Sequence, residues 1–347
     1  MHPPPLLPIF VLVLTLTACS PHEGDEAGEC SDGADNDRDG LWDCNDPDCS
    51  GAPECAGDTG LDEYISSAGV TWDAVAGGGV TTCGIQSGGQ TWCWGSDEYN
   101  QASPPGSSLG QVSVSFHHSC GLDLDGQIRC WGCGGDYDNG QCDAPEGAWA
   151  QATAGTSHSC AVDAEGVAEC WGCGNDFGQC DPHDDRYSQI SAGSQHSCGV
   201  SASGSVLCWG DEDKGATDAP EGSWTQVSAG KWHSCAVAAD GSIDCWGCLG
   251  DADGEPFDHG QCQAPAGSFS AVATASYHSC GLATDGSLAC WGCFGQEGDD
   301  DVDLGQCSPP AGSFTALAVG KYHGCALRDD ARILCWGNDY FGQISPP

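Results

Sequence analysis

Short segments in which apolar and polar residues alternate recur along most of the chain. Trp224-Thr-Gln-Val-Ser-Ala-Gly230 is one of them, and its period of two is typical of a half-buried strand. A second apolar segment and a third, which ends in Cys-Trp-Gly, follow it. This arrangement occurs seven times at intervals of 37 to 45 residues, and each copy predicts about four short strands. One such sheet cannot bury its own faces, whereas seven sheets arranged radially can.

Each copy contains two cysteines ten positions apart. A three-residue hairpin loop between them, such as residues 164–166, places the two cysteines opposite each other on neighbouring strands. Six copies have Gly at the third loop position, which favours a left-handed residue, and Ala331 in the seventh predicts a strained or different turn. A disulfide in each hairpin would add roughly 2–3 kcal/mol of stability. The predicted pairs are Cys83–Cys93, Cys120–Cys130, Cys160–Cys170, Cys198–Cys208, Cys235–Cys245, Cys280–Cys290 and Cys325–Cys335.

Four copies carry one further pair of cysteines. One cysteine of the pair follows Trp-Gly and the other follows Gly-Gln. The remaining three copies lack both, which indicates that the two cysteines of a pair form a disulfide with each other. Zinc is the alternative, since Cys130 and Cys133 have C-x-x-C spacing, but three copies keep the hairpin pair without the second pair. The predicted pairs are Cys133–Cys142, Cys173–Cys180, Cys248–Cys262 and Cys293–Cys307.

The segment Ser-Ala-Gly-x-x-His-Ser-Cys-Ala-Val-x-x-Asp-Gly-x-x-x-Cys-Trp-Gly, residues 228–247, resembles the repeat of the regulator-of-chromosome-condensation family. The resemblance covers residues 70–347 and implies a seven-bladed β-propeller, so together with the predicted cysteine pairs we expect an all-β, disulfide-rich fold. Because propellers have many unrelated activities, the resemblance implies the fold and not the function. The last segment, residues 342–347, is expected to complete the first blade and close the ring.

Residues 1–18 have the pattern of an export signal. An apolar run ends in Leu-Thr-Ala-Cys19, which resembles the bacterial lipobox and predicts lipidation of Cys19, with residues 19–29 as a tether. The alternative is an ordinary secretory peptide that is cut nearby. Residue 20 is Ser, where inner-membrane lipoproteins have Asp, and this resemblance implies sorting to the outer membrane. We therefore expect an outer-membrane lipoprotein or a cell-surface protein. It would contact the membrane only through its lipid.

An aspartate-rich stretch at residues 30–55 predicts a small disulfide-bonded module. Its spacing matches the D-x-D-x-D-G start of a calcium loop, and clustered oxygen ligands suit Ca²⁺. A solvated acidic linker is the alternative. The four cysteines Cys30, Cys44, Cys49 and Cys55 allow three connectivities, and residues 56–69 form a linker to the propeller. The predicted calcium ligands are Asp35, Asp37, Asp39, Leu41, Asp43 and Asp46.

The net charge of −43, with only eight Lys and Arg residues, excludes nucleic acid as a partner. Much of the acidic charge lies between Trp-Gly and Gly-Gln, in loops that should leave the same side of a propeller. Either this charge provides solubility, or it forms a face that binds a basic partner. The candidate binding residues are Asp251, Asp253, Glu255, Asp258, Asp299, Asp300, Asp301 and Asp303.

Repeated polar residues favour a structural role over catalysis. Six copies have a His two residues before the first cysteine, and equivalent positions on different blades cannot converge on one metal ion. His183 and Asp184 are the only candidate general-base pair that breaks the repetition, and no nucleophile accompanies them. We therefore expect no enzyme but an exported binding protein for an unidentified protein or surface macromolecule. A structural surface protein and an enzyme with a site in the central channel are the alternatives.

Overall fold

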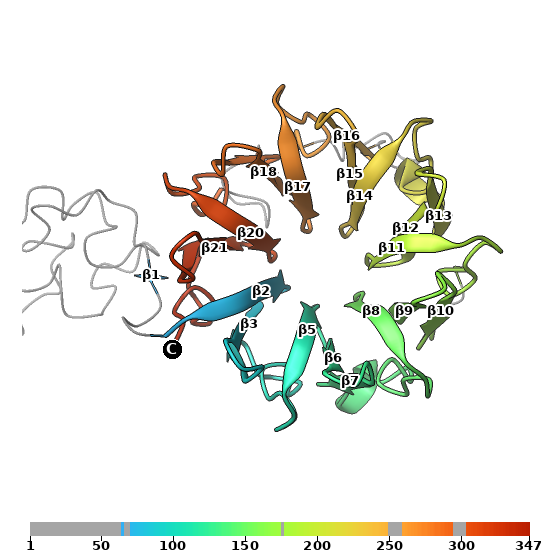
Figure 1. Cartoon of the computed structure of the whole chain (residues 1–347), viewed down its shortest axis with the longest axis horizontal. Helices are drawn as coiled ribbons and strands as arrows, with labels where there is room; N and C mark the ends of the chain where they lie inside the picture. The colour runs from blue at the N-terminus through green and yellow to red at the C-terminus, as the bar shows by residue number, and fades with distance from the viewer. Residues whose placement is uncertain (1–63, 66–69, 175–176, 249–258, 294–302) are drawn as a thin grey trace, which may run out of the picture. The chain divides into compact units, whose positions relative to one another are not determined.

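The computed structural model describes residues 64–65, 70–174, 177–248, 259–293 and 303–347. Within the compact unit Glu63–Pro347, seven antiparallel sheets surround a common centre (Figure 1), which confirms the seven-bladed, all-β prediction. We number the sheets as blades 1 to 7 in chain order. The described part of the chain has no helix with the length and apolarity needed to span a membrane.

Each blade consists of three consecutive strands joined in a meander. The inner strands, which surround the centre in Figure 1, are β2 (Trp72–Gly78), β5 (Leu109–Val114), β8 (Trp149–Ala154), β11 (Tyr187–Ala192), β14 (Trp224–Ala229), β17 (Phe269–Thr274) and β20 (Phe314–Val319). The middle strands are β3 (Thr81–Gln86), β6 (Ser119–Asp123), β9 (Ser159–Asp163), β12 (His196–Ser201), β15 (Ser234–Ala238), β18 (Ser279–Ala283) and β21 (His323–Arg328). The outer strands are β4 (Thr91–Gly95), β7 (Ile128–Trp131), β10 (Ala168–Trp171), β13 (Val206–Gly210), β16 (Ile243–Trp246), β19 (Leu288–Trp291) and β22 (Ile333–Gly337).

The prediction of about four strands per repeat was wrong for six blades, which have three strands each. The segment after each outer strand forms turns instead. It contains prolines, such as Pro104, Pro105 and Pro145, which have no N–H to donate to a fourth strand. Within the described residues, only blade 7 gains a fourth strand, because β1 (Tyr64–Ile65) pairs antiparallel with β22.

The hairpins between middle and outer strands form as predicted. Cys160 pairs directly opposite Cys170, and the same register holds for the two hairpin cysteines of every blade. The third loop residue has a positive φ in all seven hairpins, including 62° at Ala331. Ala331 therefore adopts the left-handed conformation that glycine provides without strain elsewhere, which confirms the expectation of a strained turn.

The hydrophobic core lies between neighbouring blades. Val237 and Ile243 of blade 5, for example, form one buried cluster with Phe269, Val272 and Trp291 of blade 6. Each repeat thus covers the apolar face of the next, as expected for a sheet that cannot bury both of its faces alone. The core fixes the blades side by side and leaves the turns at their two edges free to form surfaces.

Four of the interfaces add polar contacts between inner strands. The Gln151 side chain donates from Nε2 to the Ile190 carbonyl (2.9 Å) and accepts from the Ile190 N–H (2.9 Å), so its amide takes the place of a paired strand residue. A hydroxyl two residues further on accepts from the next blade, as when Thr153 Oγ1 accepts from the Ala192 N–H. Equivalent glutamines and hydroxyls connect blades 2 to 3, 4 to 5 and 5 to 6 as well.

The C-terminal segment closes the ring onto blade 1, although not as an added strand. Thr82 Oγ1 donates to the carbonyl of Gln343 (2.9 Å), and Ile344 packs in one cluster with Trp72 and Trp94. Asp339 holds the segment by accepting from the backbone N–H of Ile344 and the hydroxyl of Ser345. Closure of the ring at blade 1 is confirmed, and side-chain packing provides it.

Candidate functional site

Two sets of loops meet at one edge of every blade. In a three-stranded meander, the turn from inner to middle strand and the loop that leaves the outer strand lie at the same end. Contacts between them show this directly: Tyr99, in the loop after blade 1, meets His117 of the first turn of blade 2 at a ring-centroid distance of 5.1 Å. We call this side the loop face and the opposite side, which carries the hairpin turns, the hairpin face.

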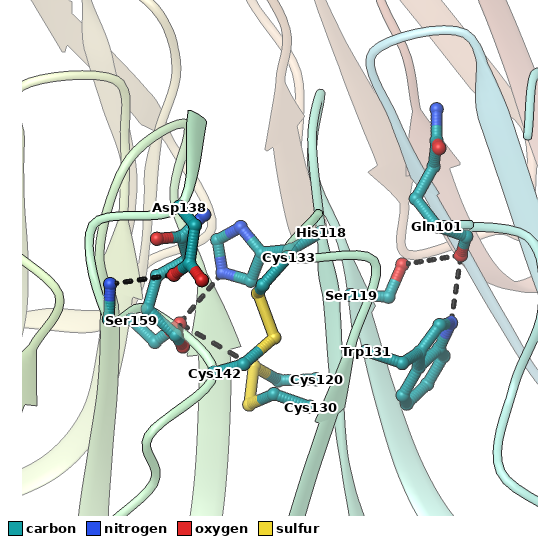
Figure 2. Close-up of a disulfide and its surroundings, with 12 residues drawn as sticks. Gln101, His118, Ser119, Cys120, Cys130, Trp131, Cys133, Asp138, Cys142 and Ser159 are labelled. Carbon is teal, nitrogen blue, oxygen red and sulfur yellow. Dashed lines mark hydrogen bonds between the residues drawn. A yellow bond between two sulfur atoms is a disulfide. The ribbon is translucent and has the colours of Figure 1, made fainter. Parts of the chain in front are cut away.

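A glutamine fixes the base of most of these loops. The Gln101 side chain accepts from the N–H of Tyr99 (2.8 Å), and the Gln101 carbonyl accepts from Ser119 and from Nε1 of Trp131 in the next blade (3.1 and 2.8 Å; Figure 2). Five more repeats have the same turn, with N–H to Gln Oε1 distances of 2.5 to 2.9 Å. The repeated tryptophans therefore hold the loops of the preceding blade, and the loop face has a rigid floor.

Beneath the loop face, the six repeated histidines form a buried belt: His118, His158, His196, His233, His278 and His323. In five of them Nε2 lies 2.7 to 2.8 Å from a hydroxyl of the next blade, as His118 does from Ser159 in Figure 2. Burial lowers the pKa of His158 to about 3 and that of His196 to about 4, so the belt is neutral at physiological pH. The belt is thus structural, as predicted from its spacing.

His278 is the exception in this belt. The position that should supply its hydroxyl is Gly324, where the other repeats have Ser or Thr. Among the described residues, neither ring nitrogen of His278 has a hydrogen-bond partner, although the side chain is buried. Within the belt, the interface between blades 6 and 7 therefore has the fewest hydrogen bonds to its buried histidine.

Disulfides fasten both the hairpins and the loop bases. The structure joins all eleven predicted pairs within the propeller, with Cα–Cα distances of 4.0 Å in the hairpins. The second pairs of blades 2, 3, 5 and 6, such as Cys133–Cys142 in Figure 2, span 6.0 to 6.2 Å between Cα atoms and tie the two ends of one loop. So many disulfides indicate an oxidising compartment.

Large apolar side chains are exposed on the loop face. Tyr340 is 80% exposed and Phe341 47%, both in the loop after blade 7. Tyr137, Phe177 and Leu304 occupy the corresponding loops of blades 2, 3 and 6 and are also exposed. Tyr137 stacks on His117 with centroids 4.3 Å apart. The sequence interpretation concentrated on the acidic residues of these loops and overlooked the aromatic ones.

All three lysines of the chain lie on the loop face, near aromatic rings. Lys214 Nζ is 3.9 Å from the ring centroid of Trp232, and Lys321 Nζ is 4.3 Å from that of Tyr322. Lys231 lies 5.1 Å from the centroid of Trp232. These are cation–π distances, and Lys231 and Lys321 place positive charge at the central cavity of a molecule with a net charge of −43.

The turns of the loop face surround a central cavity of about 80 Å³. Small residues, mostly Gly, Ala and Ser, form most of its wall, and Phe116, Lys231 and Lys321 are the large side chains that line it. The cavity is an opening along the propeller axis rather than a deep apolar pocket.

The hairpin face is different. Arg129 forms an ion pair with Asp123 (3.0 Å), and Arg332 forms one with Asp330 on the hairpin turn of blade 7. Each arginine on these turns is held by a carboxylate from its own hairpin. The hydrogen bond from the Arg332 side chain lowers the pKa of Asp330, which favours the ionised carboxylate of this pair.

Several predicted site residues lie outside the described residues. These are Cys19, the four cysteines of residues 30–55, the calcium ligands Asp35, Asp37, Asp39, Leu41, Asp43 and Asp46, and the loop residues Asp251, Asp253, Glu255, Asp258, Asp299, Asp300 and Asp301. Asp303 is described: it is exposed, and its Oδ1 accepts from the N–H of Gly305 (2.9 Å). The acidic residue that can be placed therefore shapes the loop base.

The candidate general base His183 has a structural environment. Its Nε2 lies 3.2 Å from the carbonyl oxygen of Cys208, and its ring meets the edge of Trp209. The carbonyl of His183 also accepts from the Tyr187 hydroxyl. His183 thus connects the start of blade 4 to its outer strand.

Comparison with known proteins agrees with this fold. Four segments match the model of the regulator of chromosome condensation (RCC1) repeat, at residues 111–141, 187–216, 224–251 and 314–343. The chain is a repeat β-propeller. Its repeats are similar to the RCC1 repeat in sequence, and no curated protein sequence matches the chain as a whole.

Solved propellers have the same architecture. The CRINKLY WD40 ectodomain of the Arabidopsis thaliana receptor kinase ACR4 is 23% identical, with a TM-score of 0.62 over 79% of this chain and 98% of that one. The ectodomain of the Physcomitrella patens receptor kinase CR4 is 25% identical, with a TM-score of 0.59 over 78% and 74%. A chain in the structure of Kap60 bound to yeast RCC1 (Prp20) is 14% identical, with a TM-score of 0.58 over 81% and 82%.

Proposed function

We propose that this protein is an exported binding protein that holds a protein partner on the loop face of its propeller. The observation that carries the proposal is the set of exposed aromatic and apolar side chains on that face, with loop bases fixed by glutamine hydrogen bonds and disulfides. Rigid, exposed aromatic side chains are typical of binding surfaces, because little conformational entropy is lost when they are covered.

The similar structures support this class of function. One is a complex of Kap60 with yeast RCC1 (Prp20), and two are ectodomains of plant receptor kinases. They are proteins that bind other proteins or lie outside the cell. A catalytic role has less support, since His183 is engaged in structural contacts.

A capture experiment tests the proposal. The full chain would be immobilised and cross-linked to proteins from the cells that produce it. A variant with Tyr137→Ser, Tyr340→Ser and Phe341→Ser, which lacks the exposed aromatic side chains of the loop face, would be treated in parallel. A matched control is Leu124→Ser with Val167→Ser, which removes exposed apolar side chains from the hairpin face. We expect a partner that the loop-face variant loses and the control keeps. Equal capture by both variants, or loss in the control alone, would refute the loop face as the binding surface.

We propose further that lipidation of Cys19 anchors the protein and that the aspartate-rich module binds calcium through Asp35, Asp37 and Asp39. The lipobox-like sequence and the ligand spacing support these two assignments. Mass spectrometry of the mature N-terminus tests the first. Calcium titration of the full chain by calorimetry, beside Asp37→Asn, tests the second, and an unmodified Cys19 or an absence of calcium uptake would exclude the respective assignment.

A further inference from the structure

The turns of blades 5, 6 and 7 bring three hydrogen-bond donors to the wall of the central cavity. Lys231, Ser276 and Lys321 occupy the same position of their respective repeats, two residues after the end of the inner strand, and all three line the cavity. The turns of blades 5 and 6 are in contact, because the Lys231 N–H donates to the carbonyl of Ala275, the residue before Ser276 (3.0 Å). The other blades have Gly79, Phe116, Thr156 and Ser194 at this position, so the positive charge gathers on one side.

The two ammonium groups have no carboxylate partner among the residues that the structure describes. Lys231 Nζ is 3.5 Å from the Tyr277 hydroxyl and 5.4 Å from the centroid of that ring. Lys321 lies over Tyr322. A ring face attracts a cation but does not accept its N–H groups as a carboxylate does, so each ammonium can still donate to an anion.

Ser276 provides an independent sign of a missing ligand. Its side chain is only 2% exposed, and its hydroxyl has no hydrogen-bond partner within the described structure. An unpaired buried hydroxyl is costly, and natural proteins rarely leave one without a bound molecule beside it. Ser276 lies between the two lysine positions in the ring of blades, and a carboxylate accepts hydrogen bonds from a hydroxyl as well as from ammonium groups.

We propose that this site, which we call the cavity-mouth site, binds a carboxylate of the protein partner, and that basic residues flank this carboxylate in the partner. The inference rests on the proposed function of the loop face. The flanking basic residues follow from charge: the chain carries −43, and carboxylates such as Asp97, Asp211 and Asp303 lie on the loops around the site. This field repels a simple anion, whereas a positive segment with one acidic side chain is attracted as a whole.

A pair of capped hexapeptide libraries tests the inference. Both have Lys at each end and random residues inside, with one fixed Glu in the first and one fixed Gln in the second. The full chain is immobilised, and retained peptides are quantified by mass spectrometry. The overall charge of the protein favours the Gln library, which is more positive, so preference for the Glu library requires a specific carboxylate site. We expect the Glu library to be enriched by roughly tenfold, the effect of one good charge-assisted contact.

The variant Lys231→Gln with Lys321→Gln should reverse this preference, and Ser276→Ala should reduce it. Arg129→Gln with Arg332→Gln removes the same charge from the hairpin face and should leave the preference unchanged. Equal or greater retention of the Gln library by the wild-type chain, or retention of neither library, would overturn the inference. Capture of a protein partner that is unaffected by the lysine variant would also overturn it while the proposed function stands.

Discussion

The ring is held together in two different ways. From blade 2 to blade 6, inner strands carry Gln-x-Ser or Gln-x-Thr and reach the next blade with three hydrogen bonds, as Gln189 and Ser191 do to blade 5. From blade 6 through blade 7 to blade 2, the same two positions are both Ala, as in Ala271 and Ala273. We call these the glutamine arc and the alanine arc.

In the alanine arc, no such side-chain hydrogen bonds join the inner strands among the described residues. Close backbone approach is common to both arcs, since a Cβ on Gly155 in the glutamine arc would clash with the carbonyl oxygen of Gly193. A Cβ on Gly77 would lie 3.2 Å from the backbone of Val319, and Gly78 is packed against the backbone of Val114 with no room for a side chain. The arc also contains His278, whose ring nitrogens have no hydrogen-bond partner in the described part of the chain, and the contact between blade 1 and the C-terminal segment. The comparison shows that a blade interface can form with or without polar bridges between its inner strands, and it identifies the alanine arc, which lacks them, as the weaker part of the ring.

The largest effect should come from acid, which acts on both arcs at once. The belt histidines have pKa values of about 3 to 4 in the folded protein and near 6.5 when unfolded. As pH falls below 6.5, the unfolded chain binds protons that the folded chain cannot, so stability is lost down to about pH 4. Each histidine favours the unfolded state further with every pH unit below 6.5, and because six histidines act together the loss should reach several kcal/mol.

Thermal unfolding between pH 7 and pH 4 measures this loss, and hydrogen exchange at pH 5 shows where the ring opens first. We expect early exchange in the inner strands beside His278 and His323. Earlier exchange around Gln151 and Gln189 would contradict the ranking of the two arcs. A flat melting temperature over this range would show that the belt is not buried in neutral form.

Gln189→Ala removes two of the three hydrogen bonds that bridge the inner strands at one interface of the glutamine arc. The N–H and the carbonyl of Val227 both lose the Gln189 side chain as their hydrogen-bond partner, and the shorter Ala side chain cannot replace it. The free energy of unfolding should therefore fall by about 2–4 kcal/mol. Chemical denaturation measures the change. Gln127→Ala is the control, since Gln127 is bonded only at an exposed turn, and it should change stability by less than about 0.5 kcal/mol.

A pair of histidine substitutions separates the arcs further. His196→Leu leaves the hydroxyl of Ser234 without its buried partner and should cost about 1–3 kcal/mol. His278→Leu removes two unsatisfied nitrogens and should be neutral or stabilising. The melting temperatures of the two variants at pH 7 test this difference. An equal decrease in melting temperature for both variants would mean that His278 has a hydrogen-bond partner in solution.

The smallest effect concerns the one strained hairpin, in the alanine arc. Ala331→Gly relieves a left-handed alanine while its carbonyl keeps the hydrogen bond from the Trp72 N–H (2.8 Å) across the closure. We expect a gain of about 0.5–1 kcal/mol. Gly286→Ala at the equivalent turn, with φ of 86°, should lower stability by a similar amount, and a loss in both variants would rule out strain at Ala331.

The features that the sequence predicted well depend on residues close together in the chain. The hairpin disulfides need only a ten-residue spacing, and the turn glycines need only a positive φ, so both could be derived from one repeat. The number of strands was predicted less well. The segment after each outer strand has the length of a fourth strand. Its prolines, however, have no N–H for a strand ladder, and the glutamine turn binds another backbone N–H through the glutamine side chain.

The cavity-mouth site could not be predicted from one repeat, because each of its residues comes from a different blade. Lys231, Ser276 and Lys321 are about 45 residues apart along the chain, and only the closed ring brings them to one opening. A signal was nevertheless present, since the three share one position of the repeat. Equivalent positions of the repeats also distinguish Gln-x-Ser from Ala-x-Ala, so the division into two arcs is visible in the amino-acid sequence itself.

All eleven disulfides of the propeller close within a single repeat, between cysteines 7 to 14 positions apart. Each bond can therefore form as soon as its own repeat has entered an oxidising compartment, without waiting for a distant cysteine. No bond joins one blade to another within the described chain, so oxidation locks the individual blades and leaves their assembly into a ring reversible. A fully oxidised propeller can open at a blade interface and close again with every covalent bond intact.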